Sequence, residues 1–288
     1  MGEIRMQFGS ANKAAALIAL MSFAIFTGAD ASVKLLSDRF SVFQVTFVLT
    51  SYAVLFIAAW ALIAGKAAAI VPKAPLFASV RGILLATETL LIYYAFSTVP
   101  LAEAYVIAFL APIMVAVLAV IFLGERMSMW GALGVALGFA GVLVVMQPGR
   151  SEIALGHVAA IFSALIFSIT LLMLRRTKAH EDDLALAAVP LVILALMAGC
   201  FLPWAGGFPA LDLKDLLIFM LGGFCLFLGH TLLVKAFRVG EASVVAPFQY
   251  SQIIWGSAFG LVLFGSPIEL TTMLGAAIII LSGWLVLR

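Results

Sequence analysis

Two ionisable side chains stand in the middle of long apolar segments of the chain. Glu88 lies in Ala86-Thr87-Glu88-Thr89-Leu90, and His230 lies in Gly229-His230-Thr231. A charge at the centre of a bilayer costs about 2.5–3.5 kcal/mol on insertion scales, so such a group needs a partner or a function. Because histidine titrates near neutral pH, the pair is a candidate for binding a solute or coupling its movement to a proton. The alternative is structural: Glu88 bonds a nearby hydroxyl, and His230 bonds a backbone carbonyl.

A second set of side chains could hold a ring-bearing ligand. It consists of tyrosines in the first half of the chain and of amides and aromatic rings in the second: Tyr93, Tyr94, Tyr105, Gln249, Tyr250, Gln252 and Trp255. Such rings offer a flat apolar face with one polar handle, although Trp and Tyr also collect at membrane interfaces without binding a substrate. The succession Gln249-Tyr250-Ser251-Gln252 cannot all face lipid cheaply, so we expect part of it to line a cavity.

An acid and a base lie one helical turn apart near the end of the first apolar segment. Asp30 precedes Lys34 by four residues, the order that suits an ion pair on a helix. We expect a structural pair near the membrane interface, and a gate is the alternative.

Two prolines interrupt apolar segments at corresponding places in the two halves. Pro112 and Pro247 each remove a backbone donor and are expected to kink their helices. Such bends could serve movement between two states or only shape a cavity. Gly131, Gly134, Gly138 and Gly141 form a small-residue surface, which indicates close helix packing within the monomer, with dimerisation as the alternative.

The composition places the chain in a membrane. It is 65% hydrophobic and 10% charged over 288 residues, far from the balance of soluble domains. Continuous apolar runs indicate helices rather than strands of a barrel. Ten runs are long enough to span a bilayer, near residues 13–36, 41–64, 76–97, 101–123, 129–147, 154–175, 184–204, 215–236, 241–264 and 269–287.

A repeat with an offset of 141 residues organises these ten spans. It superimposes Ala19, Ser22, Ile25, Phe26, Gly82, Ala95, Phe96, Gly124 and Gly134 on Ala160, Ser163, Ile166, Phe167, Gly223, Ala236, Phe237, Gly265 and Gly275. We therefore divide the chain into an N-terminal tail (1–12) and two five-helix repeats (13–148 and 149–288). In this register Glu88 and His230 fall on equivalent helices, one position apart. Membrane carriers place their solute sites between such repeats.

The distribution of Lys and Arg predicts the orientation. With a cytoplasmic N-terminus, twelve basic residues lie inside and four outside, which favours both termini in the cytoplasm. Because five helices is an odd number, the second repeat enters from the opposite side, and the repeats are inverted. Ala29-Asp30-Ala31 could pass for a signal cleavage site, but this span has an internal copy, so we expect it to be retained.

Several classes of function lack their motifs. The sequence contains no Walker loop, HExxH or GxSxG pattern, and Cys200 and Cys225 lie within spans, where they indicate neither a disulfide framework nor a metal site. We expect no catalytic residues, metal, cofactor or nucleic-acid partner. The expected partners are a small-molecule substrate and the lipid bilayer, and the protein is expected to be a monomer or a homodimer.

Several motifs resemble EamA-type transporters of the drug/metabolite transporter superfamily. They are Pro100-Leu101-Ala102-Glu103-Ala104, Leu123-Gly124-Glu125-Arg126 and Gly138-Phe139-Ala140-Gly141-Val142 in the first half, and Ala236-Phe237-Arg238 and Ala246-Pro247-Phe248-Gln249-Tyr250 in the second. The resemblance implies a ten-helix inner-membrane carrier with a central cavity. This chain departs from the family pattern at two places: Ser266-Pro267 stands where relatives often carry a glutamate, and the second span lacks the basic residue that many of them have. The missing basic residue weakens the expectation of a carboxylate-type substrate.

These observations predict a secondary transporter for a small organic metabolite, with a proton as the candidate coupling ion. The aromatic residues slightly favour a planar, vitamin-like solute such as riboflavin, and export of amino acids or other metabolites and drugs is the alternative. An intramembrane enzyme using Glu88 and His230 and a scaffold without flux remain as lower alternatives.

Overall fold

A computed structural model describes residues 10–123, 129–147, 153–177, 181–207, 209–239, 245–265 and 267–286. Most of the expected N-terminal tail lies outside these residues. So do the basic residues Arg5, Arg126, Arg150, Lys178 and Arg288 of the orientation count.

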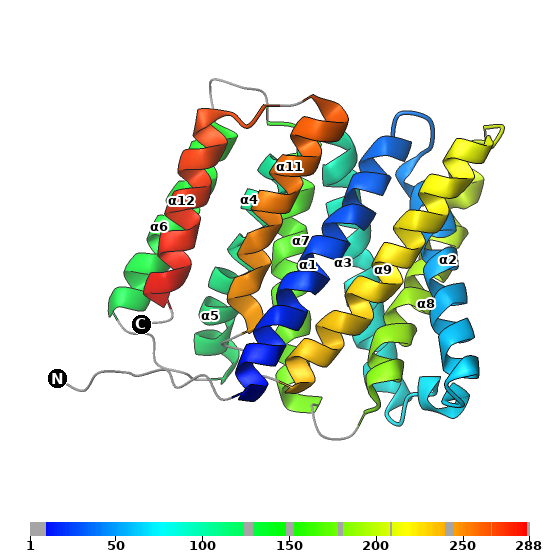
Figure 1. Cartoon of the computed structure of the whole chain (residues 1–288). Coiled ribbons are helices and arrows are strands. Elements are labelled where there is room, and N and C mark those ends of the chain that lie inside the picture. The colour runs from blue at the N-terminus through cyan, green and yellow to red at the C-terminus, as the bar shows by residue number, and fades with distance from the viewer. Residues whose placement is uncertain are drawn as a thin grey trace.

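The described chain is all helical, and its helices form ten membrane-crossing segments, five in each repeat (Figure 1). The first repeat contains α1 (Ser10–Leu36), α2 (Val42–Ile63), α3 (Pro75–Thr98), α4 with α5 (Leu101–Ala108 and Leu110–Leu123) and α6 (Met129–Met146). The second contains α7 (Leu155–Thr177), α8 (Asp183–Phe201), α9 (Leu213–Val239), η3 with α11 (Ala246–Ser251 and Gln252–Phe264) and α12 (Leu270–Val286). Two short 3₁₀ turns, η1 (Ala67–Ile70) and η2 (Leu202–Trp204), lie in connections.

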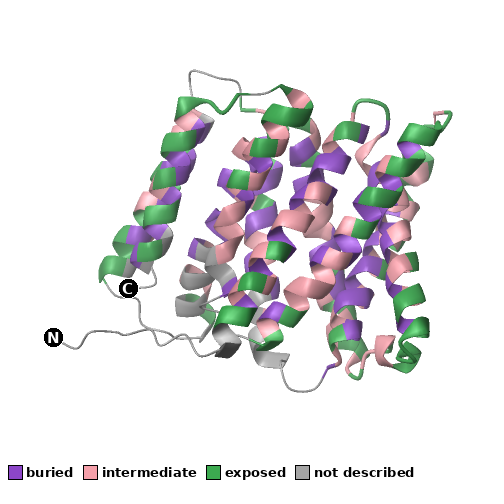
Figure 2. Cartoon of the chain, viewed as in Figure 1, coloured by how far each residue is buried: buried purple, intermediate pink, exposed green. Residues whose placement is uncertain are grey.

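The outer faces of the helices carry the side chains that lipid requires. Ile63, Leu76 and Val262 are 79–87% exposed, and Figure 2 shows exposed residues along the outward faces of the helices. By length and composition alone, five described helices can cross a membrane, in α1, α2, α3, α8 and α9, and three shorter apolar helices accompany them. The remaining segments are divided in two, which explains why length alone does not find them.

Two interruptions divide the fourth and ninth segments. The fourth breaks at Phe109, next to the carbonyl of Ala108 that Pro112 leaves without its usual helical donor. Pro247 lies in the 3₁₀ segment η3, which directly follows the helical Val245 and directly precedes α11, so the ninth segment departs from α-helical geometry at the proline.

The packing of the helices has the two-fold character of an inverted repeat. Helix α1 packs on α9, and its counterpart α7 packs on α3, the counterpart of α9. The pairs α2 with α8, α4 with α11 and α6 with α12 each join a helix to its own counterpart. Helices α1 and α7 run in opposite directions, and α12 finishes at the end of the bundle where α1 starts (Figure 1). Exchanging the halves therefore reproduces the same set of packed helices.

Glycines allow a close approach of two backbones between α6 and α12. A Cβ atom on Gly141 would lie 3.1 Å from the carbonyl oxygen of Gly275, and one on Gly275 would lie 2.8 Å from that of Gly141. Gly138 also faces α12, where an added Cβ would lie 3.1 Å from Ser282 Oγ. The small-residue surface of α6 thus serves packing within the monomer at these positions.

We expect Gly275→Ala to destabilise the protein by about 1–3 kcal/mol, because the new methyl group overpacks a contact between two backbones. The measurement is thermal unfolding of the purified protein in detergent. Gly207→Ala is the control, since nothing lies within 4 Å of its added Cβ. Equal melting temperatures for the two variants would contradict the assigned contact.

Candidate functional site

A cavity of about 160 Å³ lies between the two repeats. Helices α1, α3 and α4 contribute to its wall from the first repeat, and α7, α8, α9, η3 and α11 contribute from the second. Its polar lining consists of Asp30, Glu88, Thr89, Tyr93, Tyr105, Ser163, His230, Gln249 and Gln252. Its larger apolar lining residues are Phe23, Phe26, Leu85, Ile92, Phe96, Phe167, Pro190, Leu191, Leu194, Leu226 and Leu233.

The cavity lies where equivalent faces of the two repeats meet. Many of its lining residues occur in pairs that the offset of 141 residues relates: Phe23 with Ala164, Phe26 with Phe167, Leu85 with Leu226, Thr89 with His230, Ile92 with Leu233, and Ala108 with Gln249. Such a set surrounds the axis that exchanges the halves. Inverted-repeat carriers place their solute and coupling sites in this position.

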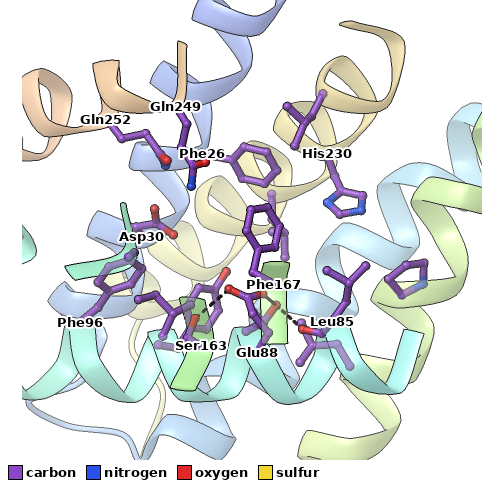
Figure 3. Close-up of a pocket in the computed structure, with 18 of the residues that line it drawn as sticks. Phe26, Asp30, Leu85, Glu88, Phe96, Ser163, Phe167, His230, Gln249 and Gln252 are labelled. Atoms are coloured by element: carbon purple, nitrogen blue, oxygen red, sulfur yellow. Dashed lines mark hydrogen bonds between the residues drawn. The ribbon is translucent and has the colours of Figure 1, made fainter. Parts of the chain in front are cut away.

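Glu88 is held at the cavity by two hydroxyl groups. Ser163 Oγ on α7 donates to Glu88 Oε1 at 3.0 Å. Thr89 Oγ1 lies 3.2 Å from Glu88 Oε2 and 2.8 Å from the carbonyl oxygen of Leu85, so its one proton is shared between two acceptors. The expected structural alternative, a bond from Glu88 to a hydroxyl, is therefore present, and the carboxylate still lines the cavity (Figure 3).

The equivalent contact in the other repeat has a different acceptor. Ser22 is the counterpart of Ser163, and Gly229, not His230, is the counterpart of Glu88. Ser22 Oγ donates to the backbone carbonyl of Gly229 at 2.8 Å. Equivalent serines thus join α1 to α9 through a backbone acceptor and α7 to α3 through a carboxylate.

Asp30 contributes a second carboxylate. Its side chain is only 7% exposed, and Tyr105 on α4 donates its hydroxyl to Asp30 Oδ2 at 2.5 Å. Phe96 packs on the Tyr105 ring with centroids 5.1 Å apart. A buried carboxylate therefore faces the cavity next to aromatic rings.

Three further polar side chains converge on the same space. His230, Gln249 and Gln252 line the cavity, and Figure 3 shows them on different segments around it. His230 meets the ring of Phe26 edge to face, with centroids 6.0 Å apart. None of the three side chains forms a hydrogen bond to another described residue, so their polar atoms remain available to a ligand. The expected bond from His230 to a backbone carbonyl is not found among the described residues.

Three predicted residues do not line the cavity. Tyr94 is 36% exposed, one residue from the buried Tyr93 that does line it. Tyr250 packs edge to face on Phe109 with centroids 5.2 Å apart. The hydroxyl of Tyr250 and the indole nitrogen of Trp255 are buried, without a hydrogen-bond partner within the described part of the chain. Periodicity alone does not separate these positions from the lining ones.

The expected pairing of Asp30 with Lys34 is wrong in this structure. Lys34 Nζ donates to the carbonyl oxygens of Phe96 at 3.0 Å and Val99 at 2.9 Å, at the C-terminal end of α3. Carbonyls in the last turn of a helix lack intrahelical donors and attract cations. These acceptors hold Lys34, whereas Tyr105 holds Asp30.

The sequence interpretation missed several lining residues. Phe26 and Phe167 were visible as a repeated pair, and that repetition is the signal that could have identified them. Pro190, within α8, carried no such signal. Outside the cavity, His157 Nε2 lies 2.8 Å from Glu103 Oε1, while His157 Nδ1 accepts from the Ala154 N–H. The second bond leaves the proton on Nε2, which donates to Glu103.

Charged contacts join the helices at both ends of the bundle. At one end Arg39 binds Asp215 at 2.6 Å and Asp212 at 3.1 Å. The Asp215 backbone N–H, with help from Arg39, holds the pKa of Asp212 below its usual range. At the other end Arg238 binds Asp183 and the Glu181 carbonyl.

Glu181 also fixes the start of α3. Its Oε2 and Oε1 accept from the backbone N–H groups of Lys73 at 2.9 Å and Ala74 at 2.6 Å. A carboxylate at a helix N-terminus satisfies donors that have no intrahelical partner and complements the helix dipole. The connection between α7 and α8 is thereby tied to α3. Within the described residues, no group of three His, Cys, Asp or Glu side chains could hold a metal ion.

Comparison with known families gives a match in both halves. The model of the EamA-like transporter family matches residues 13–147 and 154–288. Solute carrier family 35 member G1 of Mus musculus is 30% identical over 228 residues, which cover 72% of this chain and 60% of that protein. The chain thus spans less than two thirds of this relative.

Relatives with named solutes differ from one another. A riboflavin transporter of Rhizobium johnstonii is 26% identical over 67% of this chain and 63% of its own length. An S-adenosylmethionine uptake transporter of Rickettsia bellii is 24% identical over 91% of this chain and 89% of its own length. A protein crystal structure, 18% identical, covers 95% of this chain and 96% of its own with a TM-score of 0.69, a likeness that shows the fold alone.

We expect Lys34→Met to lower stability by about 1–3 kcal/mol, because the carbonyls of Phe96 and Val99 lose a charged donor. Thermal unfolding checks this loss, with Lys66→Met as a control in an exposed connection. A double-mutant cycle with Asp30→Asn should be additive within about 0.5 kcal/mol. A larger coupling energy would contradict this result and indicate a direct ion pair between Asp30 and Lys34.

Proposed function

Since the chain belongs to the EamA-like transporter family, we propose that it is a secondary carrier, which moves a small organic solute across the bacterial inner membrane by alternating access. The observation that carries this proposal is the cavity lined by equivalent residues of both repeats. In such an arrangement the two halves can exchange conformations around one site. The solute then faces each side of the membrane in turn.

The ends of the bundle supply the contacts that such a cycle must break and remake. Arg39 links the connection before α2 to the start of α9, and Arg238 links the end of α9 to the start of α8. Opening toward one side requires the contacts at that end to separate while those at the other end persist. The excess of basic residues at the end carrying Arg238 supports its assignment, and that of both termini, to the cytoplasm.

The size of the cavity supports a compact solute. A dry cavity of about 150 Å³ binds benzene, so this cavity of about 160 Å³ admits one ring or a body of similar size. The three-ring system of riboflavin, slightly favoured from the sequence, would require the site to enlarge. An amino acid or a similarly small metabolite, the alternative from the sequence, fits this conformation better.

A proton is the proposed coupling ion, and Glu88 is its proposed carrier. Its carboxylate lies at the contact between α3 and α7, where a change of protonation alters the bond to Ser163 directly. His230 lies on the counterpart of α3 and faces the same cavity. An enzyme that uses Glu88 and His230 as acid and base is the weaker interpretation, because the sequence carries none of the searched motifs that would supply a nucleophile or a metal.

We expect Glu88→Gln to reduce flux driven by a pH gradient by about tenfold or more while retaining solute exchange, since an amide cannot carry the proton. The assay uses proteoliposomes and the solute that a thermal-shift screen of vitamins, aromatic amino acids and nucleosides identifies. Glu269→Gln, in an exposed loop, is the control. Unchanged transport together with unchanged pH dependence would remove Glu88 from the coupling mechanism.

The two equivalent serines provide an internal comparison. Ser22→Ala and Ser163→Ala each remove one buried hydrogen bond between helices and should each cost about 0.5–3 kcal/mol. Only Ser163→Ala should alter the pH dependence of transport per folded molecule, because only its acceptor titrates. Identical pH profiles for the two variants would assign the Ser163 bond to folding alone.

A further inference from the structure

The cavity contains hydrogen-bond acceptors to which no described residue donates. Asp30 and Glu88 both line it, whereas no lysine or arginine is among its described lining residues. Tyr105 reaches one oxygen of Asp30, Oδ2, and no described residue donates to Oδ1. An ionised carboxylate only accepts hydrogen bonds, so a donor for this oxygen must come from a bound molecule or from water.

Lys34 and Arg81, two described cations on α1 and α3, do not line this cavity. Lys34 donates to the carbonyls that end α3. Arg81 lines a separate, smaller cavity with Glu181, and its buried Nε has no hydrogen-bond partner among the described residues. Burying a charge without a partner is expensive, so a positive charge on a bound solute would stabilise the ionised form of a carboxylate in this cavity.

An unpartnered amide independently indicates a ligand in this space. Gln252 is 8% exposed, its side chain forms no hydrogen bond to a described residue, and it is directed at the cavity from the first turn of α11 (Figure 3). A buried amide without a partner costs about 1–3 kcal/mol. A polar group on a ligand beside Asp30 would satisfy it.

Aromatic rings complete the surroundings of the carboxylates. Phe26 and Phe167 approach the cavity from equivalent positions on α1 and α7, and Phe96 lies near Asp30 (Figure 3). Tyr105, which donates to Asp30, packs on Phe96. The faces of aromatic rings attract ammonium groups, most strongly where water is excluded. An anion would instead meet two carboxylates in a medium that screens charge weakly.

We propose that the site binds an organic cation, with its ammonium group at Asp30 and a single ring or similar apolar body between Phe26 and Phe167. This inference rests on the proposed carrier function and names the charge class of its solute. Asp30 receives the ammonium because its Oδ1 is open, whereas both oxygens of Glu88 already meet hydroxyl groups. Gln252 fixes a polar substituent on the same molecule.

A series of probes with one ring and different head groups tests the charge class. The purified full-length protein is unfolded thermally in detergent with phenethylamine, 2-phenylethanol or phenylacetate at equal concentrations. Ligands that bind the folded state raise the melting temperature with concentration. We expect a rise with phenethylamine alone. An equal rise with the alcohol, a larger rise with the anion or no rise with the amine would overturn the proposal.

A matched pair of variants tests the place of the ammonium. Asp30→Asn should weaken the apparent affinity for phenethylamine at least about tenfold, because the charge-assisted bond is lost. Glu269→Gln should leave it unchanged. Retained affinity in Asp30→Asn would remove Asp30 from the site. Should that variant fail to fold, the probe series with the unmodified protein still decides the charge class.

Solute counterflow in proteoliposomes separates this inference from the proposed function. Flux of a neutral solute without binding of phenethylamine would leave the carrier in place and overturn the cation site. Binding of phenethylamine without flux of it or of any screened solute would support the cation site and overturn the carrier.

Discussion

Hydrocarbon offers no hydrogen-bond partner, so each polar group in a membrane span must find one within the protein. This constraint explains most polar side chains of the bundle. Thr27 and Ser32 return their hydroxyl protons to carbonyls one turn earlier, each at 2.9 Å. Lys34 finds the carbonyls at the end of α3. The central cavity nevertheless brings together several groups without a described partner, among them His230, Gln249 and Gln252. Other buried groups without a described partner, such as those of Thr46, Thr50, Tyr250 and Trp255, lie outside its lining.

The symmetry of the fold decides where that place is. The packed pairs α1 with α9 and α7 with α3 are exchanged by the repeat, and the cavity lies between them. Glycines such as Gly141 and Gly275 hold α6 against α12 at one edge of the bundle, apart from the cavity (Figure 1). The molecule thus keeps a tightly packed element beside the pairs that must move relative to each other in the proposed cycle.

The sequence predicted the repeat, the spans and the positions of Glu88 and His230, because each depends on periodicity and on the cost of charge in lipid. The sequence did not predict the contacts between segments that are distant along the chain. Tyr105 lies 75 residues from Asp30, and their bond depends on how α4 is rotated toward α1. The rotation of α3 in the bundle likewise buries Tyr93 and leaves Tyr94 exposed. Lys34 has an acidic residue at the right spacing for an ion pair, but it donates instead to backbone carbonyls at the end of α3.

Equivalent serines join α1 to α9 and α7 to α3, but the two repeats supply different kinds of acceptor. In the first contact the acceptor belongs to the backbone of Gly229, which every amino acid would supply. In the second it belongs to the side chain of Glu88, which a single codon can change. The acceptor in the first copy therefore needs no side chain at Gly229, whereas the acceptor in the second copy depends on the side chain of Glu88 and can change with it. Because the contact is duplicated, its acceptor can vary in one repeat while the other repeat keeps a backbone acceptor.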